Sequence, residues 1–111
     1  MNKNTNRTGD INEMLVCSKL LEYGFEVMRN VACTGLIDIV VFSNKTKKTY
    51  LFDIKTCKPY TKEDGSIRYH TGYLTEHQEE VGIKICFFLD NKVYVKENTE
   101  IVEIIDYDVK S

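Results

Sequence analysis

Two apolar segments decide the fold: LIDIVVF at residues 36–42 and YLFDIKT at residues 50–56. Both are rich in β-branched and aromatic side chains, which predicts a strand in each. The polar stretch between them, residues 43–48, is short enough to join antiparallel neighbours. Because side chains alternate between the faces of a strand, Asp53 and Lys55 are expected to share one face.

The charges within these strands suggest a chemical site. An antiparallel pairing would bring Asp38 beside Asp53, so two carboxylates and the Lys55 amine would converge. Such a cluster can bind Mg²⁺ or Mn²⁺ through oxygen ligands, with Lys55 near the metal-bound water or the phosphate that it attacks. In the alternative interpretation, Asp53 and Lys55 form a surface ion pair worth less than about 1 kcal/mol. Asp38 favours the first interpretation, because it interrupts an apolar run where an unpartnered carboxylate is costly.

Length and composition indicate a single globular domain. The chain has 111 residues, 42% of them hydrophobic and 29% charged, which suits one ordinary domain and leaves no room for a second. We expect a flexible arm at residues 1–8 and the domain at residues 9–111. No apolar stretch has the length of a membrane span or signal peptide, which predicts no membrane association and a cytoplasmic location.

Cysteine and histidine spacing gives no zinc motif. We therefore expect reduced thiols, mostly small core residues. The residues concerned are Cys17, Cys33, Cys57, Cys86, His70 and His77.

Positive charge is unevenly distributed along the chain. The net charge of −2 argues mildly against a nucleic-acid partner, but residues 43–68 carry an excess of bases and the C-terminal segment is acidic. A polyanion could therefore bind one side of the molecule; the alternative is a solvated loop. The candidate contacts are Arg7, Lys45, Lys47, Lys48, Lys58 and Arg68.

Two helices are predicted, and each contains an ambiguous polar residue. The first should begin near Asp10 and end at Gly24, with Glu13 either closing a capping box or completing the acidic cluster. The second should begin after Thr75 and end near Gly82. Gln78 presents the same choice between a capping box and an accessory role in the site.

The remaining segments complete an order of one helix, three strands, a helix and two strands. Residues 25–31 are the first strand, in which Arg29 is either a phosphate clamp or a partner for a carboxylate. Residues 57–66 are expected to form a loop and residues 67–70 a short strand or extended segment, where His70 is a base or a structural residue. Residues 83–89 and 92–96 should form a hairpin, and residues 101–105 a strand or short helix.

In this order, with GDINE at residues 9–13, GLID at 35–38 and DIKT at 53–56, the chain resembles the PD-(D/E)XK nuclease superfamily. Within it, the chain is most similar to the small Holliday junction resolvases of archaea and their viruses. The resemblance implies a restriction-endonuclease-like core, which is a central mixed β-sheet flanked by helices. It also implies a homodimer that cuts DNA at four-way junctions, in the host cytoplasm if the chain is viral.

The resemblance also implies roles for individual residues. Asp38, Asp53 and the backbone carbonyl of Ile54 would coordinate Mg²⁺, with Mn²⁺ able to substitute. Glu13 would bind a second metal or its water, and Lys55 would orient the hydrolytic water. Arg29 matches a position where such resolvases often place a phosphate-contacting arginine.

Two positions depart from the family pattern: Ile37 stands where the motif name has proline, and Met14 where resolvases often have arginine. The chain is also less basic than most resolvases. Two alternatives therefore stay open. One is a homing, restriction-like or repair endonuclease acting on duplex DNA, and the other is an inactive nuclease-like DNA-binding module.

Overall fold

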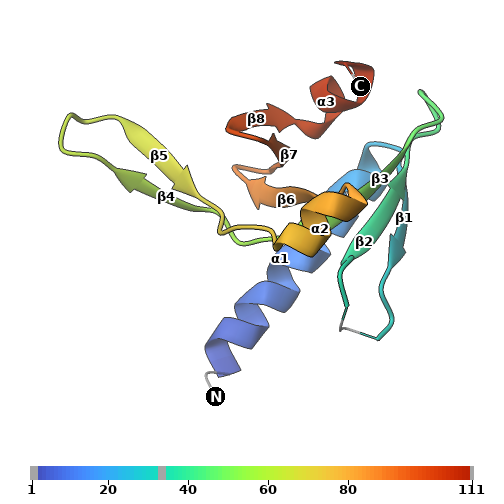
Figure 1. The fold of residues 1–111 in the computed structure, drawn as a ribbon, viewed down its shortest axis with the longest axis horizontal. Helices are drawn as coiled ribbons and strands as arrows, with labels where there is room; N and C mark the ends of the chain where they lie inside the picture. Colours follow the sequence, from blue (N-terminus) through green and yellow to red (C-terminus); the bar gives the residue numbers. More distant parts are fainter. Residues whose placement is uncertain (1–2, 33–34, 111) are drawn as a thin grey trace.

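A six-stranded mixed sheet forms the centre of the molecule (Figure 1). The structure is a computed structural model that describes residues 3–32 and 35–110, with the backbone alone for residues 3–8. The strand order is β1-β2-β3-β6-β7-β8, in which β3 and β6 are parallel and the other neighbours antiparallel. The predicted coarse class, an α/β domain with a mixed sheet flanked by helices, is confirmed. The strands are β1 (Glu26–Arg29), β2 (Ile39–Phe42), β3 (Thr49–Ile54), β6 (Lys84–Leu89), β7 (Lys92–Glu97) and β8 (Glu100–Glu103).

The predicted antiparallel pair of β2 and β3 is confirmed. Ile39 lies opposite Phe52, and the Ser43 N–H donates to the Lys48 carbonyl at 2.9 Å to close the turn. Beyond the last strand pair, the Asp38 N–H donates to the Phe52 carbonyl at 3.0 Å. This bond extends the ladder by one residue and places Asp38 beside Asp53.

Two helices cover one face of the sheet. Helix α1 (Lys3–Glu22) buries Val16 and Leu20 against the sheet residues Val41 and Phe52. Burial of such side chains is the main stabilising contribution to the domain. Helix α3 (Ile104–Lys110) packs on the same face, where the Tyr107 ring lies 5.6 Å from that of Tyr50.

A short helix lies over the opposite face, at the end of β3. Helix α2 (Glu76–Val81) begins with the predicted capping box of Thr75 and Gln78, which is confirmed, and ends at Gly82 with a φ of 93°. Glycine suits this left-handed conformation because it has no Cβ to clash. Gln78 faces the sheet and contacts Asp53.

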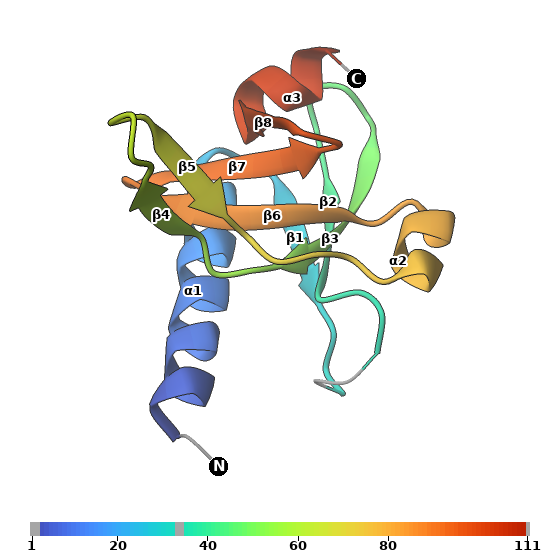
Figure 2. The same ribbon diagram turned by 60° about the vertical axis from the view of Figure 1, so that its left-hand side comes forward.

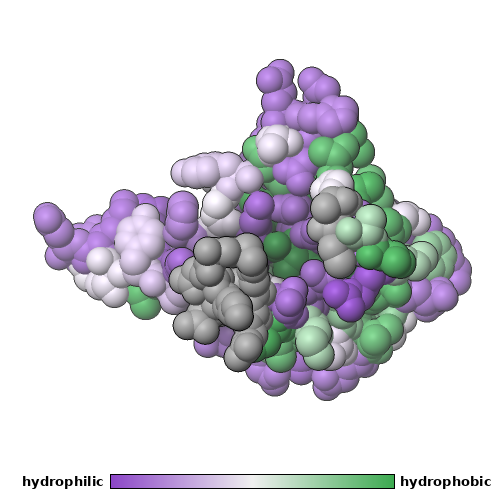
Figure 3. All heavy atoms as spheres, turned by 90° about the horizontal axis from the view of Figure 1, so that it is seen from below, coloured by the Kyte–Doolittle hydropathy of each residue, from purple (hydrophilic) through white to green (hydrophobic). Residues whose placement is uncertain are grey.

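Strands β4 (Lys58–Thr61) and β5 (Ile67–His70) form a separate antiparallel hairpin. We call residues 57–70 the β4–β5 arm. The arm follows β3 closely in the sequence and projects from the body of the molecule (Figures 1 and 2). Its outer surface is mostly hydrophilic (Figure 3).

Three local predictions are corrected. Helix α1 begins at Lys3, so residues 3–8 are helical rather than an arm, and Asp10 and Glu13 lie too far inside the helix to form its capping box. Residues 57–66 contain strand β4 rather than a loop alone. Pro59 does not prevent this strand, because both strands of a two-stranded hairpin are edge strands, where proline is tolerated. The observed order therefore adds β4, β5, β8 and α3 to the predicted one, and residues 101–105 divide between β8 and α3.

Two smaller expectations concern the thiols and the membrane. Cys17, Cys57 and Cys86 are free, as predicted, but only Cys86 is fully buried; Cys33 lies outside the described residues. Among the residues that the structure describes, no helix is long and apolar enough to cross a membrane.

Candidate active site

Asp53 and Lys55 lie on one face at the end of β3, as the strand periodicity predicts. Asp53 is 8% exposed, and its Oδ2 lies 2.9 Å from the Lys55 Nζ. The same Oδ2 atom is buried and accepts no hydrogen bond of acceptable geometry within the described chain. The Lys55 ammonium is therefore the charged partner of this buried oxygen.

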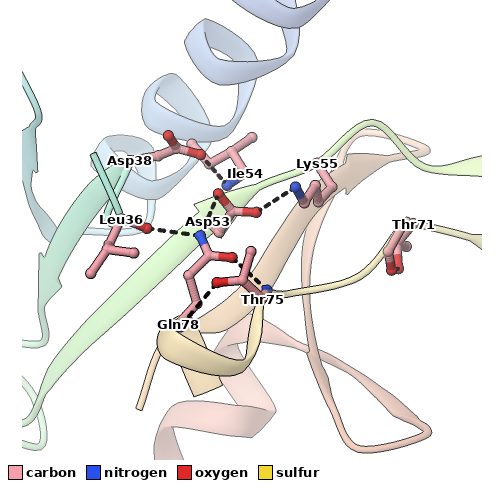
Figure 4. A network of polar contacts seen from close by, with 9 residues as sticks. Leu36, Asp38, Asp53, Ile54, Lys55, Thr71, Thr75 and Gln78 are labelled. Atoms are coloured by element: carbon pink, nitrogen blue, oxygen red, sulfur yellow. Dashed lines mark hydrogen bonds and ion pairs between the residues drawn. The ribbon is translucent and has the colours of Figure 1, made fainter. Parts of the chain in front are cut away.

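Asp38 faces the same site from the start of β2 (Figure 4). Its Oδ2 accepts a hydrogen bond from the Ile54 N–H at 2.7 Å. Burial raises the pKa of Asp38 to about 6, opposed by this backbone hydrogen bond and assisted by the nearby charges of Asp53 and Glu13. Two carboxylates thus share a partly desolvated space, in which burial and the charge of Asp53 disfavour the ionised form of Asp38.

Gln78 connects helix α2 to the carboxylates. Its Oε1 accepts from the Thr75 N–H at 2.9 Å, while its Nε2 donates to the Leu36 carbonyl at 2.9 Å and to Asp53 Oδ1 at 3.4 Å (Figure 4). Of the two interpretations of Gln78, the capping box is confirmed, and the same side chain also contacts Asp53. One amide therefore caps the helix and orients the Asp53 carboxylate.

Glu13 forms an ion pair with the guanidinium of Arg29. Its Oε1 accepts from the Arg29 Nε at 2.9 Å, so Arg29 is the partner of a carboxylate, one of its two expected roles. Within residues 3–32 and 35–110, no group of three or more His, Cys, Asp or Glu side chains is arranged to hold a metal ion. Glu13 is thus paired with Arg29, while its charge still contributes to the raised pKa of Asp38.

The predicted basic contacts do not form one group. Lys45, Lys47 and Lys48 lie in the turn at the opposite end of the β2–β3 hairpin from the carboxylates. Lys58 and Arg68 lie on the β4–β5 arm, and the side chain of Arg7 lies outside the described residues.

His70 occupies the base of the same arm, opposite Lys58. Its ring packs edge-on against that of Tyr73, with 6.2 Å between centroids. The His70 ring therefore contacts an aromatic side chain.

Several contacts around the site were not predicted. Gly72, with a φ of 77°, lies where an added Cβ would be 4.0 Å from the Lys55 Cδ. Next to it, Thr71 is buried and accepts from the Lys96 Nζ at 3.3 Å. The Asn30 side chain donates to the Ile37 carbonyl at 2.9 Å and so fixes the chain before Asp38. These contacts depend on segments distant in sequence, and only the turn residue Gly72 gave a local signal.

The donor set suits Mg²⁺ better than a metal that needs a full protein cage. Mg²⁺ is commonly held by one or two carboxylates, with water and substrate phosphate filling its other positions. Asp38 and Asp53 supply the carboxylates, and a bound cation would add to the single ion pair that Asp53 Oδ2 makes with Lys55. A cation would also relieve the repulsion that contributes to the raised pKa of Asp38.

The arrangement is thus chemically capable of binding a hydrated divalent cation next to an ammonium group. Lys55 is held by Asp53 and packed by the residue 71–72 segment. Comparisons of the chain with models of protein families, with curated proteins and with solved structures find no match.

Proposed function

We propose that this protein is a metal-dependent DNA endonuclease that hydrolyses phosphodiester bonds at four-way junctions. The observation that carries the proposal is the buried Asp53 carboxylate, which lies beside Asp38 at the start of the neighbouring strand and whose Oδ2 is 2.9 Å from the Lys55 Nζ. The resemblance of residues 9–13, 35–38 and 53–56 to the PD-(D/E)XK superfamily supports the same reaction. Two carboxylates and a lysine are the equipment that metal-assisted phosphodiester hydrolysis needs.

A bound Mg²⁺ would supply an activated water near neutral pH and neutralise charge on the phosphate. Asp38 and Asp53 would hold it, assisted by the Ile54 carbonyl, and the Ile54 N–H keeps the Asp38 carboxylate in position. The Lys55 ammonium would orient the attacking water or contact the phosphate that it attacks. Its Coulombic interaction is strong because the site is partly desolvated.

The proposed substrate follows from the size of the domain. A chain of 111 residues is too small to enclose a duplex, so two copies related by a two-fold axis would address two strands. A four-way junction presents two such strands symmetrically. The second candidate substrate is duplex DNA, with the same residues in the same roles.

Cleavage of a labelled immobile four-way junction, beside a linear duplex of the same sequence, tests the proposal. We expect paired nicks in the junction with Mg²⁺ or Mn²⁺, and none with EDTA. Asp53→Asn should lower the rate by at least about 100-fold, because the site loses a metal ligand and its charge. Asp106→Asn removes an exposed carboxylate from helix α3 and is the matched control that should retain activity.

The other outcomes are equally informative. Equal cutting of the duplex would keep the site and move the substrate to duplex DNA. Asp53→Asn cutting at the wild-type rate would remove this site from the reaction. No cutting of either DNA with Mg²⁺ or Mn²⁺ would contradict the nuclease and favour a DNA-binding module.

A further inference from the structure

The β4–β5 arm has chemically different faces. Residues that pair directly across an antiparallel hairpin share a face, as do alternate residues along each strand. The observed register pairs Tyr60 with Arg68 and Pro59 with Tyr69. The cationic face therefore carries Lys58, Tyr60, Arg68 and His70, and the apolar face carries Pro59, Thr61, Ile67 and Tyr69.

The apolar face turns toward the central sheet. Tyr69 lines a groove together with Phe87, Tyr94 and Ile101 of strands β6, β7 and β8. Because the two faces of a hairpin point in opposite directions, the cationic face is directed away from the sheet. A partner that approaches from outside therefore meets lysine, arginine and aromatic side chains first.

The lysine and arginine of the cationic face form no ion pair within the part of the chain that the structure describes. All residues of β4 and β5 are exposed, and neither Lys58 nor Arg68 forms an ion pair with a described residue. The acids of the arm, Glu63 and Asp64, lie at its tip, where Asp64 accepts hydrogen bonds from the Ser66 N–H and Oγ. The two strands therefore present cations without compensating carboxylates, although the whole chain has a net charge of −2.

The arm begins next to the candidate active site. Strand β4 starts three residues after Lys55. The chain that returns from the arm passes the Lys55 side chain at Gly72. A polyanion held on the cationic face would therefore continue toward the carboxylates.

We propose that the β4–β5 arm lies in the major groove of the duplex that flanks the scissile phosphate. This inference rests on the proposed nuclease function and adds the element that grips the DNA. The major groove of B-form DNA admits a two-stranded β-ribbon. Lys58 and Arg68 contact phosphates, and the Tyr60 ring and hydroxyl contact the groove wall between them.

Binding of a short labelled duplex in Ca²⁺, measured by fluorescence anisotropy over a range of salt concentrations, tests this role. Arg68→Ala should weaken binding roughly tenfold and reduce the slope of log K against log salt by about 1, because one phosphate contact is lost. Tyr60→Ala should weaken binding without changing the slope. Lys110→Ala removes one exposed charge from helix α3, and Thr61→Ala truncates the opposite face of the arm; both should bind as the wild type does.

Three outcomes would overturn the inference, and they are distinguishable. If the wild type cuts DNA through Asp53 but Arg68→Ala binds normally with an unchanged slope, the arm has no role and the nuclease stands. If the wild type neither binds nor cuts DNA, the proposed function itself fails. If Arg68→Ala changes the oligomeric state in light scattering and leaves the salt slope intact, the arm contacts a second copy instead. Circular dichroism of each variant verifies that the domain remains folded.

Discussion

At the scale of single residues, the raised pKa of Asp38 predicts a pH-dependent cost to stability. Burial first, and then the Asp53 and Glu13 charges, raise this pKa to about 6 in the folded protein. Asp38 therefore binds its proton more tightly in the folded protein than in the unfolded chain. The resulting stabilisation of the folded state is fully present below the unfolded pKa of Asp38 and is lost as pH rises through about 6.

Asp38→Asn should therefore stabilise the metal-free protein at neutral pH. We expect a gain of about 1–2 kcal/mol in the free energy of unfolding at pH 7.5 in EDTA, reduced from the full shift because the group is only half-buried. The gain should vanish below about pH 4, where both states are protonated. Urea denaturation at both pH values measures it, with Asp106→Asn as the control. An equal gain at both pH values would contradict the electrostatic explanation.

Strand periodicity was sufficient to predict the side chains that the strands bring together, but not the contacts that the helices add. The shared face of Asp53 and Lys55 depends only on local alternation, and Asp38 follows from pairing β2 with β3. Glu13 was less predictable, because its pairing with Arg29 depends on how helix α1 packs on the sheet and not on local spacing. Gln78 could be identified as a capping residue, but its contact with Asp53 required the crossover that places α2 over β3.

At the scale of secondary structure, Asp108 fastens helix α3 to the β2–β3 hairpin. The carboxylate is 3% exposed and accepts hydrogen bonds from the hydroxyls of Ser43, Thr46 and Tyr50. Burial alone raises the pKa of Asp108, but these three bonds and the charge of Lys48 outweigh it, and the pKa lies below its usual value.

Asp108→Ala should consequently lower the free energy of unfolding by about 3 kcal/mol at neutral pH, because buried hydroxyls lose a charged acceptor. The stability that ionised Asp108 contributes to the folded protein is present above the usual pKa of aspartate. It is lost as pH falls through the lowered pKa that Asp108 has in the folded state. The difference from wild type should therefore shrink in acid. Urea denaturation measures it, and Asp106→Ala on the same helix should change stability little. A wild-type midpoint for Asp108→Ala would show that α3 is held by its apolar contacts instead.

Element boundaries were the least predictable part of the fold. The first turns of α1 are rich in Asn and Thr and have no apolar stripe, so the sequence signal for the helix begins only where burial begins. Strand β4 was missed because Pro59 and the polar residues around it are typical of a loop. Strands are recognised in a sequence by the alternation of apolar and polar residues that arises when one face is buried. Strands β4 and β5 are exposed on both faces, so burial imposes no such alternation on their sequence.

At the scale of the whole molecule, the proposed action on two strands predicts a defined stoichiometry. Each four-way junction should bind two chains of 12.9 kDa, because each chain offers one carboxylate site for one strand. Multi-angle light scattering of the junction complex in Ca²⁺ measures the bound mass, with the free protein and the linear duplex complex as references. A single chain on each junction would contradict paired cleavage.

The parallel pairing of β3 with β6 also determines when the site can form during synthesis. Asp38, Asp53 and Lys55 are all translated before the arm, helix α2 and strand β6. Pairing across such a long crossover requires loop closure and is slower than the local β2–β3 hairpin. Gln78 can reach Asp53 only after this crossover has emerged from the ribosome. A nascent chain would thus carry its charged residues without their final geometry until strand β6 has left the ribosome and paired with β3.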